Sequence, residues 1–182
     1  MYDSFEVHRV LIVGPLRVAR DTWPEEIRKW DHLKDLTCSV VVGSVTERRR
    51  ALQKPADLYI VNRENLVWLC KNCRLDFDMV VLDELSSFKN QQAQRFKAMK
   101  ALRPKVKRIV GLTGTPSGNG LMDLWAEFRL LDMGERLGRY ISQYRNTYFQ
   151  PDKQNGMVVF PTSPCREQRT PSTRRFRTLP CP

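Results

Sequence analysis

Two observations on the sequence predict an α/β fold with a parallel sheet. Five short apolar runs rich in β-branched residues recur along the chain and hardly alternate with polar residues, which is typical of strands buried on both faces. Between them lie stretches in which apolar residues recur every three to four positions, as on one face of a helix. Strands that alternate with helices favour a right-handed, doubly wound layer structure.

The strand pattern occurs in five segments, namely residues 10–13, 39–42, 58–61, 79–82 and 108–112. The helical pattern occurs in three segments, namely residues 19–33, 87–102 and 120–131. Pro24 suits the first turn of the first helix, and Pro104 closes the second. Trp23, Trp30 and Trp125 lie on the apolar faces of these helices, so we expect them in the core rather than as platforms for stacked bases.

Composition and charge narrow the class of protein. The 182 residues are 41% hydrophobic, which suits one globular domain with a core. No run of about 18 apolar residues and no signal-like amino terminus occur, so we expect neither a membrane span nor secretion. The formal net charge of +11 favours a polyanionic partner such as nucleic acid. After Phe160, however, five arginines stand against one glutamate, so the case for DNA depends on the motifs.

The cysteines and the carboxyl-terminal residues carry weaker signals. Five cysteines without a secretion signal predict reduced thiols in the cytoplasm. Cys70 and Cys73 have the spacing of half a zinc site but lack a second pair of ligands, so two thiols at a helix end are the simpler interpretation. Residues 136–148 indicate a helix or an extended basic surface. The Pro- and Arg-rich residues 161–182 predict a disordered tail, either a natural basic linker or the product of a frameshift.

Two adjacent carboxylates follow the fourth predicted strand. Asp83 and Glu84 would lie at the carboxyl edge of the sheet, where α/β folds bind ligands. In a phosphoryl-transfer site the first carboxylate can hold Mg²⁺, often through water, and the second can orient and deprotonate the attacking water. Taken alone, an acidic pair after a strand is more often a helix cap.

Small hydroxylated residues follow the fifth predicted strand. Residues 113–116 read Thr-Gly-Thr-Pro and lead into the helix predicted over residues 120–131. Such a strand end can reach the same edge as Asp83 and pass the state of a bound nucleotide to a nucleic-acid surface. Taken alone, the series is merely a turn with suitable chemistry.

Together these two segments resemble the Walker B and third motifs of superfamily-two helicases, specifically of the Swi/Snf-like branch. The resemblance is carried by Asp-Glu-Leu-Ser-Ser-Phe-Lys-Asn at residues 83–90 and by Leu-Thr-Gly-Thr-Pro…Asn…Leu-Trp over residues 112–125. Residues 10–30 resemble motif Ia with its helix, and residues 58–66 resemble motif Ib. The Asp-Glu-Leu-Ser variant is most like phage and prophage members. The resemblance implies an incomplete RecA-like ATP-binding domain over residues 1–160 of a bacterial or phage-encoded protein.

The resemblance also implies roles for single residues. Asp83 would contact Mg²⁺ through water, and Glu84 would polarise the attacking water. Thr113, Gly114 and Thr115 would sense the nucleotide and couple it to DNA. The residues implied to lie along the backbone of double-stranded DNA are Pro15, Leu16, Arg17, Asn62 and Arg63. Both arginines suit phosphate chemically, although an ordinary solvated charge explains each about equally well.

A motor of this family also needs a Walker A phosphate loop, Gly-x-Gly-Lys-Thr, and a second RecA-like domain with arginine fingers. No such loop occurs in the chain, so we expect ATP and Mg²⁺ to bind weakly or not at all and ATPase activity to be at background. A separately encoded Walker A segment and a second RecA-like domain are the implied partners. In the family the phosphate-loop strand lies beside the third-motif strand, so residues 109–112 are expected to form an apolar edge.

Two other functions are compatible with the residues. A non-catalytic DNA- or protein-binding module would keep the α/β scaffold without the chemistry. A metal-dependent nuclease that uses Asp83 and Glu84 would need further carboxylates and a lysine near the same strand ends. Asp76 and Asp78 lie at the beginning of their strand, the wrong end, so the nuclease is the least favoured.

Overall fold

The computed structural model describes residues 7–118, 120–149, 152–154 and 157–159. The chain divides into two compact units, Met1–Gly114 and Thr115–Pro182. The expectation of one incomplete domain over residues 1–160 stays a prediction. None of the helices in the described ranges is long and apolar enough to cross a membrane.

The first unit is built on a five-stranded parallel sheet in the order β2-β3-β1-β4-β5. Its strands are β1 (Val10–Gly14), β2 (Cys38–Val41), β3 (Leu58–Asn62), β4 (Met79–Asp83) and β5 (Arg108–Leu112). The predicted fold class is confirmed, and each predicted strand matches an observed one to within a residue at either end. Because all five strands run in parallel, their carboxyl ends meet at one edge of the sheet.

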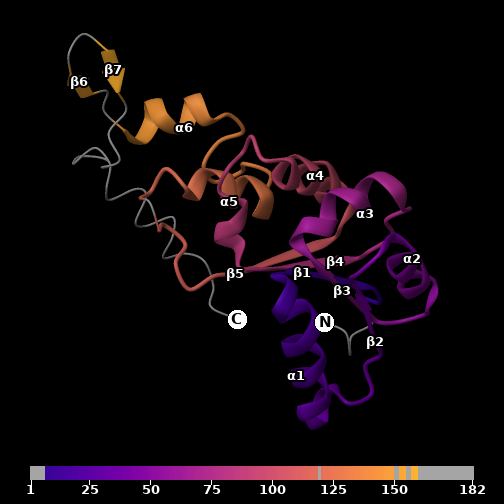
Figure 1. Cartoon of the computed structure of the whole chain (residues 1–182). Coiled ribbons are helices and arrows are strands. Elements are labelled where there is room, and N and C mark those ends of the chain that lie inside the picture. The colour runs from indigo at the N-terminus through magenta and orange to yellow at the C-terminus, as the bar shows by residue number, and fades with distance from the viewer. Residues whose placement is uncertain (1–6, 119, 150–151, 155–156, 160–182) are drawn as a thin grey trace. The chain divides into compact units, whose positions relative to one another are not determined.

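Helices cover both faces of this sheet (Figure 1), with α1 on one face and α3 and α4 on the other. The helices of the first unit are α1 (Trp23–Lys29), α2 (Val45–Gln53), α3 (Leu66–Asn72) and α4 (Gln94–Leu102). A π-helical turn, η1 (Val18–Thr22), leads directly into α1. The short 3₁₀ turns are η2 (Asp31–Leu33), η3 (Arg63–Asn65), η4 (Leu85–Phe88) and η5 (Arg103–Lys105).

Alternate residues of each strand pack on opposite faces of the sheet. On the α1 face, Ala19 and Ile27 pack with a row of strand residues. That row consists of Val10, Ile12, Leu58, Ile60 and Val81. Since side chains alternate along a strand, Asp83 emerges on the same face as Val81, which is the face that α1 covers.

The first predicted helix is shorter than expected, and the prediction for Trp30 is wrong. Helix α1 ends at Lys29, and Trp30 adopts extended backbone angles of φ −96° and ψ 119°. The Trp30 side chain is 48% exposed, and its Nε1 donates a hydrogen bond to Glu26 Oε2 at 2.7 Å. The residues that follow, 31–36, are mostly polar and begin with a 3₁₀ turn. Of these residues, Leu33 and Leu36 pack against the core.

The two later helices of the prediction begin closer to the carboxyl end than expected. The segment over residues 87–102 is split into η4 and α4, with a polar stretch at residues 89–93 between them. The four apolar residues at helical spacing are all buried, as predicted, namely Phe88, Phe96, Met99 and Leu102. The third helix, α5 (Leu124–Leu131), starts four residues late because residues 120–123 form turns.

The second unit contains α5, α6 (Ile141–Tyr148) and an antiparallel pair, β6 (Asp152–Gln154) and β7 (Met157–Val159). Trp125 is buried, as predicted, and its Nε1 donates to Gly138 O at 3.0 Å. Tyr144, also buried, donates through its hydroxyl to Leu121 O at 2.8 Å. The basic segment 136–148 is therefore a turn followed by a helix. The predicted tail, residues 161–182, lies outside the described residues.

Candidate functional site

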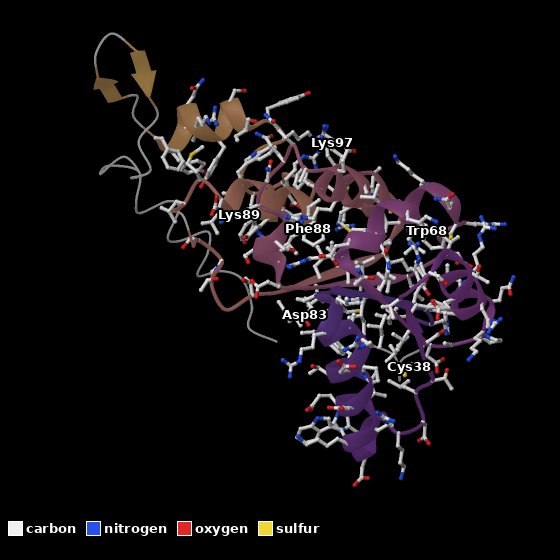
Figure 2. All side chains as sticks on the ribbon, in the orientation of Figure 1. Cys38, Trp68, Asp83, Phe88, Lys89 and Lys97 are labelled. Atoms are coloured by element: carbon white, nitrogen blue, oxygen red, sulfur yellow. The ribbon has the colours of Figure 1, made fainter. Side chains whose placement is uncertain are left out.

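Asp83 ends β4 at the carboxyl edge of the sheet. Figure 2 shows it on the α1 side, away from Phe88 and Lys97 on the opposite side of the sheet. The indole Nε1 of Trp23 donates a hydrogen bond to Asp83 Oδ2 at 2.8 Å. At the end of β1, Gly14 leaves room for the carboxylate, since a Cβ at this position would lie 3.3 Å from Asp83 Cβ. Asp83 is thus held by two neighbouring elements.

Glu84 has an unusual backbone and a different set of partners. Its angles of φ 63° and ψ 66° fall in the left-handed region, which residues other than glycine seldom occupy. Such residues cluster at functional sites, where the surrounding structure holds them in place. Glu84 Oε1 accepts hydrogen bonds from Thr113 Oγ1 at 3.1 Å and from Ser86 Oγ.

The expected meeting of the two strand ends is therefore confirmed. Residue Asp83 stands opposite Leu112 in the register of β4 and β5, and Thr113 follows directly. Gly114 is exposed, with open space where a side chain would be. Thr115, also exposed, begins the second unit. Thr113 and Glu84 thus form one cluster, while the roles of the three residues 113–115 stay predictions.

Residues 15–17 follow β1, and Asn62 ends β3 beside it, paired with Gly14. Leu16 and Arg17 are exposed. Asn62 is only 6% exposed, and its amide donates to Glu64 Oε2 at 2.9 Å. The five residues predicted to follow the DNA therefore share one edge of the sheet, but Asn62 faces inward.

Glu64 directly follows Asn62 and Arg63, two of the residues predicted to contact DNA. Its Oε1 accepts a hydrogen bond from Arg63 Nε at 3.0 Å. Partial burial opposes ionisation of Glu64, but hydrogen bonds from the Asn62 amide, its own backbone N–H and Arg63 outweigh it and lower the pKa of the carboxyl. Arg63 therefore carries a carboxylate partner with which phosphate would have to compete.

A buried arginine, Arg48, contacts the turn η3 and the helix α3 that follow β3. The Arg48 guanidinium of α2 lies 4.1 Å from the ring centroid of Trp68 in α3, close enough for a cation–π contact. Arg48 Nη1 also donates to Asn65 Oδ1 at 3.0 Å, and Asn65 donates in turn to Asn62. No sequence pattern predicts these contacts of Arg48, Trp68 and Glu64, because nothing in the local sequence distinguishes the three from ordinary surface or core residues.

The donor set at the carboxyl edge suits Mg²⁺ held mainly by water and phosphate. Among the described residues, no group of three His, Cys, Asp or Glu side chains comes close enough to hold a metal ion. Mg²⁺ commonly keeps several waters and takes one or two carboxylates together with substrate phosphates. Asp83, with Glu84 adjacent, fits that arrangement and does not fit a closed metal cage.

The carboxylates at the other end of β4 have structural partners. Asp78 Oδ2 accepts from the backbone N–H groups of His8 and Arg9, and its Oδ1 lies 2.7 Å from Lys107 Nζ. Asp76 pairs with the Arg9 side chain. Neither residue is near Asp83, so nothing here adds the carboxylates that a nuclease site would need.

The two closely spaced cysteines lie at the end of α3. Cys70 is in its last turn and Cys73 follows it directly. Burial raises the pKa of the Cys70 thiol to about 11, and burial also raises the pKa of Cys73. Both groups are therefore protonated thiols near neutral pH, which suits the predicted helix-end interpretation.

Comparisons with known proteins agree with the geometry. A family model described as SNF2-related domain matches residues 2–157. "Putative protein p41" of Acyrthosiphon pisum secondary endosymbiont phage 1 is 39% identical over 153 residues, covering 80% of this chain and 33% of that protein. "DNA excision repair protein ERCC-6-like" of Danio rerio is 30% identical over 161 residues, covering 80% of this chain and 11% of that protein.

A solved structure is similar as well. It is the "Sulfolobus solfataricus SWI2/SNF2 ATPase core in complex with dsDNA", with a TM-score of 0.69 and 28% identity. The match covers 81% of this chain and 29% of that one. The chain therefore spans about a third or less of the length of the relatives named here.

Proposed function

This chain belongs to the SNF2-related domain family, and on that premise we propose that it carries part of the first motor domain of an ATP-dependent DNA translocase. The observation that carries the proposal is the hydrogen bond from Thr113 to Glu84, beside Asp83, at the carboxyl edge of a parallel sheet. Ligands of open α/β sheets bind at this edge.

The two carboxylates have separate tasks in this proposal. Asp83 would hold Mg²⁺ through water, and the ion would supply the positive charge that phosphoryl transfer requires. Glu84 orients the attacking water and accepts its proton. Thr113 holds Glu84 Oε1 through its hydroxyl, so the position of the general base is linked to the segment that leaves β5.

That segment is the proposed connection between nucleotide and DNA. Thr113, Gly114 and Thr115 follow the strand directly, and Gly114 and Thr115 are exposed. A change in the nucleotide that moves Glu84 also changes the hydrogen bond of Thr113. Residues 113–115 then carry that change along the backbone.

Double-stranded DNA is the proposed polyanion. Leu16 and Arg17 are exposed after β1, and Arg63 begins the turn after the neighbouring strand β3. Backbone contacts of this kind give affinity without reading sequence, as a translocase requires. The net charge of +11 supports a polyanionic partner in the same way.

The chain by itself is proposed to be inactive as an ATPase. Its 182 residues contain no Gly-x-Gly-Lys-Thr, the loop whose backbone N–H groups and lysine hold the phosphates. We propose that a Walker A segment and a second RecA-like domain complete the site. Without these two parts, the chain alone binds ATP and Mg²⁺ weakly, and its phosphate release stays at background.

A chimera tests the catalytic assignment. Residues 7–149 would replace the matching segment of the Sulfolobus solfataricus core, which supplies the missing loop and second domain. We expect DNA-stimulated phosphate release from the chimera, lowered about 100-fold or more by Glu84→Gln, because general-base catalysis contributes about 10²–10⁴ in rate. The measurement is steady-state phosphate release with and without duplex DNA.

Two outcomes would contradict this assignment. One is a folded chimera that hydrolyses ATP equally well with Glu84→Gln. The other is DNA-stimulated phosphate release by the 182-residue chain alone that Glu84→Gln abolishes. If the folded chimera is inert and the chain alone binds DNA with a salt dependence that nucleotide does not alter, the non-catalytic binding module is the better description.

A further inference from the structure

Trp23 contacts the carboxylate that the proposed function assigns to the metal ion. Its Nε1 lies 2.8 Å from Asp83 Oδ2, although the two residues are 60 positions apart in the chain. Asp83 Oδ1 accepts no hydrogen bond from any described residue. One oxygen of the carboxylate is therefore held by the protein and the other is left for a ligand.

The indole that makes this bond is itself held firmly. Trp23 is partly buried and packs against the core cluster on the α1 face, which includes Ile12 and Val81. It begins α1, directly after the π-helical turn η1, a rare conformation that is frequent at functional sites. The Asp83 side chain lies between this indole and Gly14, where a Cβ would come within 3.5 Å of Oδ2. The hydrogen bond from the indole therefore favours one orientation of the carboxylate.

We propose that Trp23 is a positioning residue for Asp83, whose indole N–H holds Oδ2 and so leaves Oδ1 for the water shell of the metal ion. This inference rests on the proposed function, because it takes Asp83 as the metal-side carboxylate. Removal of a group that hydrogen-bonds and orients a metal-binding carboxylate usually lowers the metal affinity about 10–100-fold. A tryptophan whose spacing predicts an ordinary core residue thus has a second task.

A matched control is present in the same chain. Trp30 follows α1 and also donates its Nε1 to a carboxylate, that of Glu26, at 2.7 Å. This tryptophan is 48% exposed, and its indole N–H donates to Glu26 rather than to Asp83. Substitution of either tryptophan by phenylalanine removes one N–H donor and keeps an aromatic ring, so the two variants differ mainly in which carboxylate they release.

The test is the affinity for Mn²⁺ of the folded chimera described above, in which the phosphate loop and the second domain complete the site. Mn²⁺ is used in place of Mg²⁺ and is measured from the electron paramagnetic resonance signal of the free ion. We expect Asp83→Ala to abolish specific binding and Trp23→Phe to raise the Kd about tenfold. Trp30→Phe should leave the Kd unchanged. Gly14→Ala, which crowds Asp83 from the other side, should also raise the Kd.

The outcomes separate this inference from the function on which it rests. Mn²⁺ binding that Asp83→Ala abolishes but Trp23→Phe leaves unchanged overturns the role of Trp23 alone. Mn²⁺ binding that is undetectable, or that Asp83→Ala does not change, overturns the metal assignment of Asp83 and this inference with it.

A second measurement does not depend on the folding of the Trp23 variant. With ¹⁵N-labelled tryptophan, the indole N–H signal of Trp23 can be assigned by substituting the other three tryptophans in turn. In the otherwise unchanged chain, Asp83→Ala should shift this signal and leave that of Trp30 in place, and Mn²⁺ should broaden it before that of Trp30. An unmoved Trp23 signal in Asp83→Ala would show that the hydrogen bond is absent in solution.

Discussion

Asp83 and Glu84 are adjacent in the chain but are held by different elements. Asp83 continues the strand and accepts a hydrogen bond from Trp23 of α1. Glu84 leaves the strand with φ 63° and turns to Thr113 after β5. A left-handed backbone costs a residue with a Cβ about 1–2 kcal/mol. The left-handed backbone at Glu84 turns its carboxylate away from that of Asp83, and the cost of this conformation can be measured as a difference in stability.

Glycine and alanine at position 84 should therefore differ in stability. Both substitutions remove the hydrogen bonds of the Glu84 side chain, but only alanine keeps a Cβ at φ 63°. We expect Glu84→Gly to have a free energy of unfolding about 0.5–1 kcal/mol higher than that of Glu84→Ala. Urea denaturation of the two variants measures the difference. Equal stabilities, or a more stable alanine variant, would show that the backbone at this position is not strained.

Among the individual elements, the turn η3 after β3 carries side chains of opposite charge beside the proposed path of DNA. Arg63 begins it and Glu64 follows, with a hydrogen bond between their side chains. Arg48 and Trp68 support the turn through Asn65. The carboxylate thus holds the arginine in place and at the same time repels phosphate.

Charge substitutions in this turn should act in opposite directions. We expect Glu64→Gln to tighten binding of duplex DNA several-fold at low salt, because it removes a negative charge beside Arg63. Arg63→Gln should weaken binding and lower the slope of log affinity against log salt by about 1, the loss of one phosphate contact. Fluorescence anisotropy over a salt series measures both. If the Arg63→Gln slope matches that of the unmodified chain, Arg63 does not contact phosphate.

At the scale of the whole molecule, β5 lies at one end of the described sheet. It pairs with β4 and with no other described strand. Its residues are less buried than those of the central strands, and Leu112 is 42% exposed. An apolar edge of this kind presents unpaired backbone groups to other chains. We therefore expect the chain to self-associate through this edge or to pair there with a partner segment.

A lysine on the edge strand should reduce self-association. Leu112→Lys places a charge on an exposed side chain of β5, a common protection against pairing. Sedimentation velocity should show a smaller fraction of oligomers than for the unmodified chain. Tyr140→Lys, at a side chain that is 70% exposed in the second unit, is the control for added charge and should leave the fraction unchanged. A stable monomer before any substitution would contradict the expectation.

Periodicity was enough to locate the strands and the main apolar residues. A strand buried on both faces needs an almost continuous apolar run, and that run is visible without knowledge of its neighbours. The starts of α4 and α5 and the end of α1 were harder to predict. Helix ends depend on capping and on whether the residues that follow can pack against the core. Trp30 shows the limit, since its spacing matches a core position but the helix ends before it.

The parallel α/β class, the five strands and the edge at which Asp83, Glu84 and Thr113 meet could all be predicted without coordinates, because they follow from local patterns and from the common direction of parallel strands. Coordinates were needed to show that Trp23 donates to Asp83, that Asn62 faces inward and that Glu64 accepts a hydrogen bond from Arg63. These contacts depend on side-chain direction and on the packing of elements far apart in the chain, which no local spacing encodes.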